Sequence, residues 1–288
     1  MWVRCRPAHR CKEVTGTSEQ HTTTSRSAAV VEDAAPISVM GLPVLEALPS
    51  RSVPYEQVDP YILVHEGRFR PSVAAGVDTK HPHRGFDNLW YAIEGTISTG
   101  HSTGRGGSME RVRLAEGDLL FVRTGRGVWH AEAMGGDEVE EDRGDVEFRG
   151  VLFWVNLARD DKGAEPFARV LRREEIPNRR ENDAIVRILV GDGSPLQLGT
   201  PASILDVELP EGGHVTTPLP SEFQGFAYEL EGEATFGTNR QRARPPQLVV
   251  MGPGDTLAVT DATPGTRFLV MAGRPFREMP VFNGPFVD

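Results

Sequence analysis

The chain has 288 residues, of which 39% are apolar and 25% charged, enough for packed cores in two domains and unlike the composition of a disordered protein. A net charge of −10 argues against a nucleic-acid-binding protein, which needs a basic face, and no run of about 18 apolar residues offers a membrane span. The two cysteines, Cys5 and Cys11, exclude a disulfide scaffold and favour a reducing compartment.

Residues 1–42 are predicted to form a disordered extension. The segment is rich in Ser, Thr, Arg and Ala, lacks an apolar period, and is punctuated at its end by Pro36 and Pro43. Cys5, His9 and Cys11 match no common zinc spacing, and a fourth ligand is missing. We therefore expect the folded part of the protein to begin near residue 43.

From Leu42 onward, short apolar runs alternate with turn residues, among them most of the 31 glycines and 22 prolines. This pattern predicts an all-β fold. The clearest strand candidates are residues 61–64, 89–93, 119–122, 151–155, 185–190, 204–207, 226–230, 248–251, 256–259 and 268–271. One short helix is expected near Glu165 to Glu175.

The two halves of this region resemble each other. Each has a Glu-Gly pair after an aromatic-rich strand, at Glu94-Gly95 and Glu231-Gly232. Each then has a Gly-Asp turn before an apolar strand, at Gly117-Asp118 and Gly254-Asp255. The repeat predicts two β-barrels in tandem, over residues 43–165 and 175–288, with the boundary between residues 160 and 180.

Two closely spaced pairs of side chains carry the candidate chemistry. Residues two apart on a strand point to the same face, so His81 and His83 would share one space, as would His130 and Glu132. On facing strands of a small barrel the two pairs would converge on one point. Three imidazoles and a carboxylate suit Fe(II), Mn, Co, Ni or Zn, and they leave positions open on a six-coordinate ion. A His-x-His in a polar turn without metal is the alternative that spacing alone leaves open.

Longer stretches around these residues resemble the pirin family of the cupin superfamily. The resemblance runs from about Leu42 to the last residue. It rests on the segments HPHRGFD (81–87), TGRGVWHAE (124–132), LFWVNL (152–157), EEIP (174–177) and GPFV (284–287).

The resemblance implies two cupin barrels of the β-sandwich type, with the metal in the first. It assigns the ligands to His81, His83, His130 and Glu132, and it makes Fe(II) the expected ion, with Mn, Co, Ni, Zn or Cu as substitutes. The second barrel of the family lacks a metal, and here that half offers only His214, Gln224 and Glu229.

Three features depart from the family pattern. Asp87 stands where the family usually has Glu, and the chain stops one residue after the 284–287 segment, without the C-terminal helix of longer members. An acidic insertion, Asp137 to Glu147, follows the second metal pair. We expect it to be a solvated loop, with gating of the site or contact with a basic partner as the alternative.

Two functions of different classes follow from the resemblance. The first is a quercetin 2,3-dioxygenase-like enzyme that opens a small aromatic substrate such as a flavonol, with Glu132 as the catalytic base. The second is a non-catalytic, redox-sensitive regulator that binds a transcription factor or a metabolic enzyme. The fold alone cannot choose between them. Three lysines against 28 arginines are typical of a GC-rich bacterial genome, and we expect a cytoplasmic monomer.

Overall fold

The apolar runs separated by glycine and proline fold as strands. The computed structural model describes residues 23–70, 72–73, 79–103, 108–132 and 146–288. Each of the ten predicted strands lies on a strand of the structure. No helix among the described residues is long and apolar enough to cross a bilayer.

The first barrel consists of a seven-stranded sheet facing a four-stranded one. The large sheet has the order β12-β9-β6-β11-β4-β3-β2, with bounds Phe167–Leu171, Leu119–Arg123, Phe86–Glu94, Phe148–Asn156, Tyr61–Phe69, Leu42–Leu48 and Ala35–Val39. The small sheet has the order β5-β10-β7-β8, with bounds Lys80–His83, Val128–Ala131, Thr96–His101 and Glu110–Ala115.

The second barrel repeats this plan, which confirms the predicted duplication. Its large sheet has the order β1-β20-β17-β22-β15-β14-β13, with bounds Ala28–Asp33, Gln247–Met251, Gln224–Glu231, Thr266–Gly273, Ala202–Leu209, Ala184–Val190 and Asn178–Glu181. Its small sheet has the order β16-β21-β18-β19, with bounds Val215–Pro218, Thr256–Thr260, Ala234–Phe236 and Gln241–Ala243. Gly95 and Gly232, with φ of 73° and 70°, end β6 and β17 at equivalent turns.

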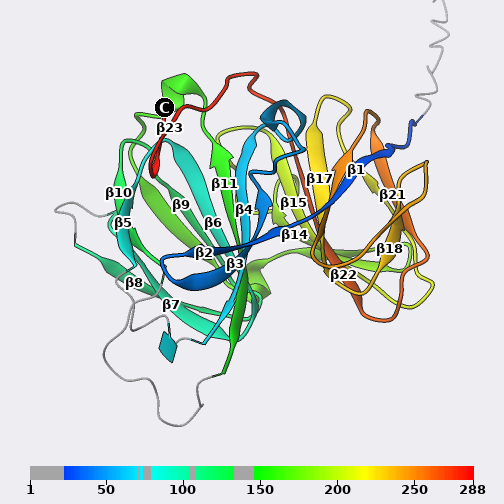
Figure 1. Ribbon diagram of the computed structural model, residues 1–288, viewed down its shortest axis with the longest axis horizontal. Coiled ribbons are helices and arrows are strands. Elements are labelled where there is room, and N and C mark those ends of the chain that lie inside the picture. The colour runs from blue at the N-terminus through cyan, green and yellow to red at the C-terminus, as the bar shows by residue number, and fades with distance from the viewer. Residues whose placement is uncertain (1–22, 71, 74–78, 104–107, 133–145) are drawn as a thin grey trace, which may run out of the picture.

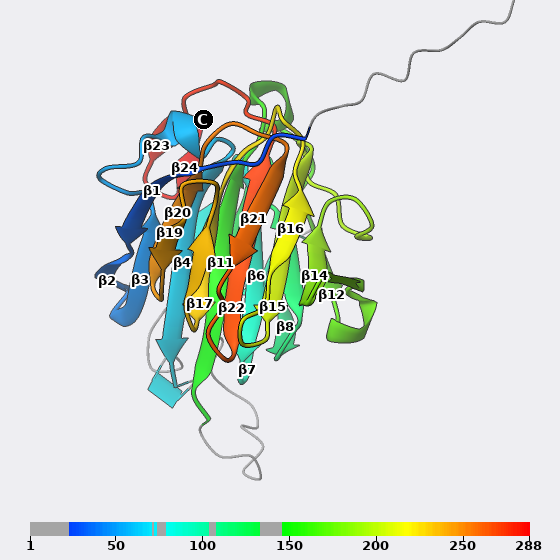
Figure 2. The ribbon, with the colours of Figure 1, turned by 90° about the vertical axis from the view of Figure 1, so that its right-hand side faces the viewer.

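The two barrels share a core as well as having one each. In Figure 1 the barrels lie side by side, and Figure 2 looks along the line that joins them. One apolar cluster contains buried residues of both large sheets, such as Phe153 of β11 and Phe226 of β17. A second cluster fills the interior of the first barrel, and a third fills that of the second. Arg149 crosses between the barrels, because its guanidinium binds Glu66 (2.6 Å) and Glu231 (2.9 Å).

The predicted extension is wrong for residues 23–42. Residues 1–22 lie outside the described part of the chain, but the next residues are ordered, with Arg26 buried and hydrogen-bonded to the Gly252 carbonyl (3.1 Å). Strand β1 pairs with β20 of the second barrel and β2 pairs with β3 of the first. The partners of β1 on β20 are more than 200 residues away in the chain, so local composition gives no sign of this pairing.

The predicted helix near Glu165 is also wrong. Residues 167–171 form β12, which pairs with β9 and extends the first barrel beyond its expected end at residue 165. Only a 3₁₀ turn, Arg173–Glu175, follows it, and two others lie at Tyr55–Gln57 and Arg159–Asp161. The backbone of β9 offers a ladder partner, and this pairing overrides a weak helical preference. The chain enters the second barrel between β12 and β13.

Candidate metal centre

The two predicted pairs meet on neighbouring strands of one sheet rather than on facing strands. Strands β5 and β10 run antiparallel, with His81 opposite His130 and His83 opposite Val128. Directly opposed residues of an antiparallel pair point to the same face. Glu132 follows the last residue of β10 and points back toward the three histidines.

The side chains of His81, His83 and Glu132 form the tightest group. One ligand atom from each lies within 4.8 Å of the others, and the two Nε2 atoms of His81 and His83 are 2.8 Å apart. His130 adjoins the group through Glu132, whose Oε2 is 3.3 Å from the His130 Nε2. The structure therefore gathers all four predicted residues, with His130 at the edge of the cluster.

The hydrogen bonds of two imidazoles decide which ring nitrogens are free. The Nδ1 of His81 lies 2.6 Å from the Thr79 carbonyl, and the Nδ1 of His83 lies 3.4 Å from the Pro285 carbonyl. A carbonyl only accepts, so each Nδ1 donates a proton, and in a neutral ring the Nε2 then carries the lone pair. Two neutral rings in this arrangement direct both Nε2 lone pairs, 2.8 Å apart, into one space, as two ligands of a single ion do. The donor set thus fits a metal ion.

The protonation states agree with this fit. Burial, followed by the neighbouring His130 and His81, lowers the pKa of His83 to about 3, so its ring is neutral. Burial alone would raise the pKa of Glu132, but His130, His81 and His83 outweigh it and lower that pKa to about 2. Metals require neutral imidazole and ionised carboxylate, and the directions of these two shifts favour those forms at His83 and Glu132.

An aromatic wall with unpaired polar atoms adjoins the cluster. The His83 ring packs edge-on against Trp154 (4.9 Å between centroids) and Phe86 (5.2 Å). Asn88 is directly opposite Trp154 in the β6–β11 ladder. The Asn88 Oδ1, the Trp154 Nε1 and the Trp90 Nε1 are buried without a hydrogen-bond partner in the described structure. Buried polar atoms are usually hydrogen-bonded, so these three are exceptions to that rule.

Asp87, the departure from the family pattern, does not reach the cluster. Its two oxygens accept from Arg123 Nε (2.8 Å) and Nη2 (2.9 Å), and Gly199 N lies 3.4 Å away. The acidic insertion falls almost wholly on residues outside the described part, as do Cys5, His9 and Cys11.

Two further histidines, which belong to no closely spaced pair in the sequence, lie near the site. His101 of β7 is opposite His130 in the ladder, and His65 of β4 is close enough for the charge of Glu132 to act on its pKa. Burial lowers the pKa of both rings. Their sequence spacing carries no signal, because strand pairing alone brings them here.

The second barrel has apolar residues at the positions that match His81 and His130. Strands β16 and β21 pair as β5 and β10 do, and Val215 lies opposite Val259 where His81 lies opposite His130. His214 instead pairs at the surface with Asp183 (2.7 Å). Glu229 is buried inside this barrel, and both of its oxygens lack a partner among the described residues.

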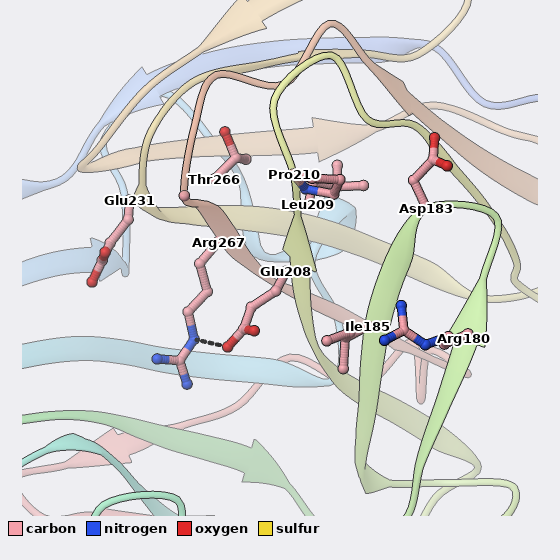
Figure 3. A pocket seen from close by; sticks show the side chains of 10 residues that line it. Arg180, Asp183, Ile185, Glu208, Leu209, Pro210, Glu231, Thr266 and Arg267 are labelled. Carbon is pink, nitrogen blue, oxygen red and sulfur yellow. Dashed lines mark ion pairs between the residues drawn. The ribbon is translucent and has the colours of Figure 1, made fainter.

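A cavity of about 450 Å³ lies on the second barrel, and its lining contains none of the four proposed ligands (Figure 3). Its acidic lining is already paired: Glu208 binds Arg187 (2.8 Å) and lies 3.9 Å from Arg267, Asp183 binds His214, and Glu231 binds Arg149. These ion pairs make it a poor candidate for a charged ligand.

Comparison with known proteins places the chain among relatives with this architecture. Residues 46–155 match the pirin family, and residues 204–288 match the pirin C-terminal cupin domain. The chain belongs to the pirin family. Pirin-1 of Arabidopsis thaliana is 34% identical over 238 residues, which cover 80% of this chain and 77% of the relative.

Two solved structures resemble this fold. Quercetin 2,3-dioxygenase from Acinetobacter baumannii has a TM-score of 0.79 at 21% identity, over 92% of each chain. The bacterial pirin YhhW from Escherichia coli, in complex with nickel(II), has a TM-score of 0.62 at 13% identity, over 88% of this chain and 100% of that chain. Because the sequence identities are only 21% and 13%, these comparisons show a shared fold and not a shared activity.

Proposed function

We propose that this pirin is a metal-dependent oxygenase of the quercetin 2,3-dioxygenase type that opens a flavonol or a similar small hydroxylated aromatic. The observation that carries the proposal is the convergence of the His81 and His83 Nε2 atoms, 2.8 Å apart, beside the Glu132 carboxylate. We assign His81, His83, His130 and Glu132 as ligands, and Fe(II) as the ion. Mn, Co, Ni, Zn and Cu suit the same donors, and nickel occupies the Escherichia coli relative.

The side chains of the site have separate tasks in this proposal. A bound ion would supply Lewis acidity and redox chemistry at the open positions. Glu132 is ionised, so it can accept the proton of a substrate hydroxyl as general base. Trp154, which contacts His83, carries an unpaired Nε1 that would donate to an oxygen of the substrate. The aromatic wall of Phe86 and Trp154 limits access of water to His83.

Oxygen uptake in the presence of quercetin tests the proposal. Protein reconstituted anaerobically with Fe(II), and separately with Mn(II), Co(II) and Ni(II), should consume O₂ only when the flavonol is added. Glu132→Gln should reduce turnover by about a hundredfold or more, the scale of lost general-base catalysis, while metal content falls much less. Glu211→Gln, at an exposed carboxylate of the second barrel, is the matched control. Absence of flavonol-dependent uptake with every metal would remove the enzyme proposal.

A cleft that borders both His83 and the exposed Trp129 favours a second candidate, a redox-sensitive regulatory protein that binds a transcription factor or metabolic enzyme. The cleft, of about 590 Å³, is lined by Arg84, Trp129 and Phe286 among others, and Trp129 is 47% exposed. Of the four proposed ligands, only His83 borders it. Under this proposal, amide exchange around Trp129 should differ between ferrous and ferric protein, and identical exchange would count against it.

A further inference from the structure

The C-terminal segment returns from the second barrel to the metal-bearing strands of the first. After β22 the chain crosses between the barrels and ends in a small hairpin of β23 (Phe282–Asn283) and β24 (Phe286–Val287), beside β5 and β10 (Figure 1). The crossing is fixed by Asp59, which accepts hydrogen bonds from Phe276 N (3.1 Å) and Arg277 N (2.7 Å). The hairpin is therefore delivered to a defined place.

The hairpin docks through backbone, apolar and charged contacts together. The Val287 side chain is fully buried and packs with Ile62 and Phe86. Val287 N donates to the Arg84 carbonyl (2.9 Å), and the side chains of Arg84 and Asp288 form an ion pair. Lys162 Nζ donates to the carbonyls of Gly85 (3.0 Å) and Val287 (3.3 Å) and so joins the hairpin to the turn after His83.

The turn after His83 is shaped for this contact. Gly85 has φ +88°, which favours glycine, and a Cβ there would lie 1.8 Å from the Val287 carbonyl oxygen. An alanine at this position would therefore have to displace the hairpin. The 81–87 and 284–287 segments are thus packed directly against each other.

The same segment provides a hydrogen-bond acceptor for a proposed metal ligand. Pro285 O lies 3.4 Å from the His83 Nδ1, at a separation of 202 residues. His81 differs, because its Nδ1 donates to Thr79 O, only two residues away in the chain. The orientation of His81 is thus set locally, whereas that of His83 depends on a docked C-terminal segment.

We propose that residues 284–288 form a positioning strap for His83. The Pro285 carbonyl holds the proton on Nδ1 and so keeps the Nε2 lone pair directed at the metal position. Metal occupancy and strap docking then stabilise each other, because coupling between two binding events is reciprocal. The inference deepens the proposed function and rests on its metal site. Pro285 positions the ligand and is not itself a catalytic residue.

Two variants should release the strap in different ways. Truncation after Asn283 removes it, and Val287→Asp places a charge at its buried anchor without changing the length of the chain. Phe282→Ala, at a side chain 52% exposed in the same hairpin, is the matched control. Circular dichroism and the melting temperature establish that each variant keeps the β fold.

Nickel(II) affinity, measured by titration calorimetry, is the first readout. Both strap variants should bind Ni(II) about 10- to 100-fold more weakly than the wild type, the usual effect of losing an outer-shell partner, and Phe282→Ala should bind as the wild type does. Conversely, Ni(II) should slow amide exchange at Val287 in the wild type. Equal affinities in all four proteins would overturn the strap while leaving the metal site in place.

The tautomer of His83 is the second readout and needs no metal. Nitrogen-15 spectra of histidine-labelled apoprotein should show His83 protonated at Nδ1 in the wild type and a mixture of tautomers in both strap variants. An unchanged His83 spectrum in folded variants would refute the strap. If the wild type bound no divalent ion, the proposed metal site would fail, and these spectra would still decide whether the strap orients His83.

Discussion

Glu229 should make the stability of this protein fall as pH rises. The residue lies on β17, fully buried, with neither oxygen paired among the described residues. Burial is the main cause that raises its pKa from 4.5 to about 9, with Arg242 opposing and Glu233 assisting. A group with a raised folded-state pKa contributes stability that is complete below pH 4.5 and is lost as pH approaches 9.

The expected size follows from the two pKa values. Each pH unit between them removes about 1.4 kcal/mol, so the loss is about 1 kcal/mol at pH 5 and about 5 kcal/mol at pH 8. Glu229→Gln keeps the shape and removes the ionisation. The free energy of unfolding of the variant should exceed that of the wild type by about 1 kcal/mol at pH 5 and by about 5 kcal/mol at pH 8.

Urea unfolding of metal-free protein at pH 5, 6, 7 and 8, at constant ionic strength, measures this difference. Glu211→Gln, at an exposed carboxyl of the same barrel, is the control and should follow the wild-type curve. Parallel curves for wild type and Glu229→Gln would refute the reasoning, since they would mean that Glu229 titrates alike in the folded and unfolded states.

Three further outcomes are expected. His81→Ala and His130→Ala should each lose nearly all bound metal yet keep the fold, because apolar cores fill both barrels; stoichiometric metal in either, by elemental analysis, would contradict the ligand assignment. Deleting residues 1–33 should lower the free energy of unfolding by about 3 kcal/mol, since it exposes the edge of β20 and removes the packing of Val30 and Val31, whereas deleting residues 1–22 is the control. Arg149→Met should cost about 3–5 kcal/mol in urea unfolding by leaving the buried Glu66 unpaired, and adding Glu66→Gln should recover part of that loss.

The strands and the candidate ligands could be recognised from the sequence because their signals are local. Apolar runs between glycine and proline indicated the strands, and the paired Glu-Gly and Gly-Asp turns indicated the duplication. His81 and His83, like His130 and Glu132, are two residues apart, so strand geometry alone sends each pair to one face. None of these inferences required knowing which strand lies next to which.

The tertiary structure decided whatever depends on partners distant in the chain. Residues 28–33 and 167–171 form strands because they pair with the edges of β20 and β9. No local sequence pattern predicts that such an edge lies nearby. His101 reaches His130, and Pro285 reaches His83, only through the ladder and the C-terminal crossing. The pKa of Glu229 likewise depends on the burial of its carboxyl inside the second barrel. Sequence periodicity reports the direction of a side chain along its own strand, whereas pairing and burial depend on the surfaces that other segments bring to it.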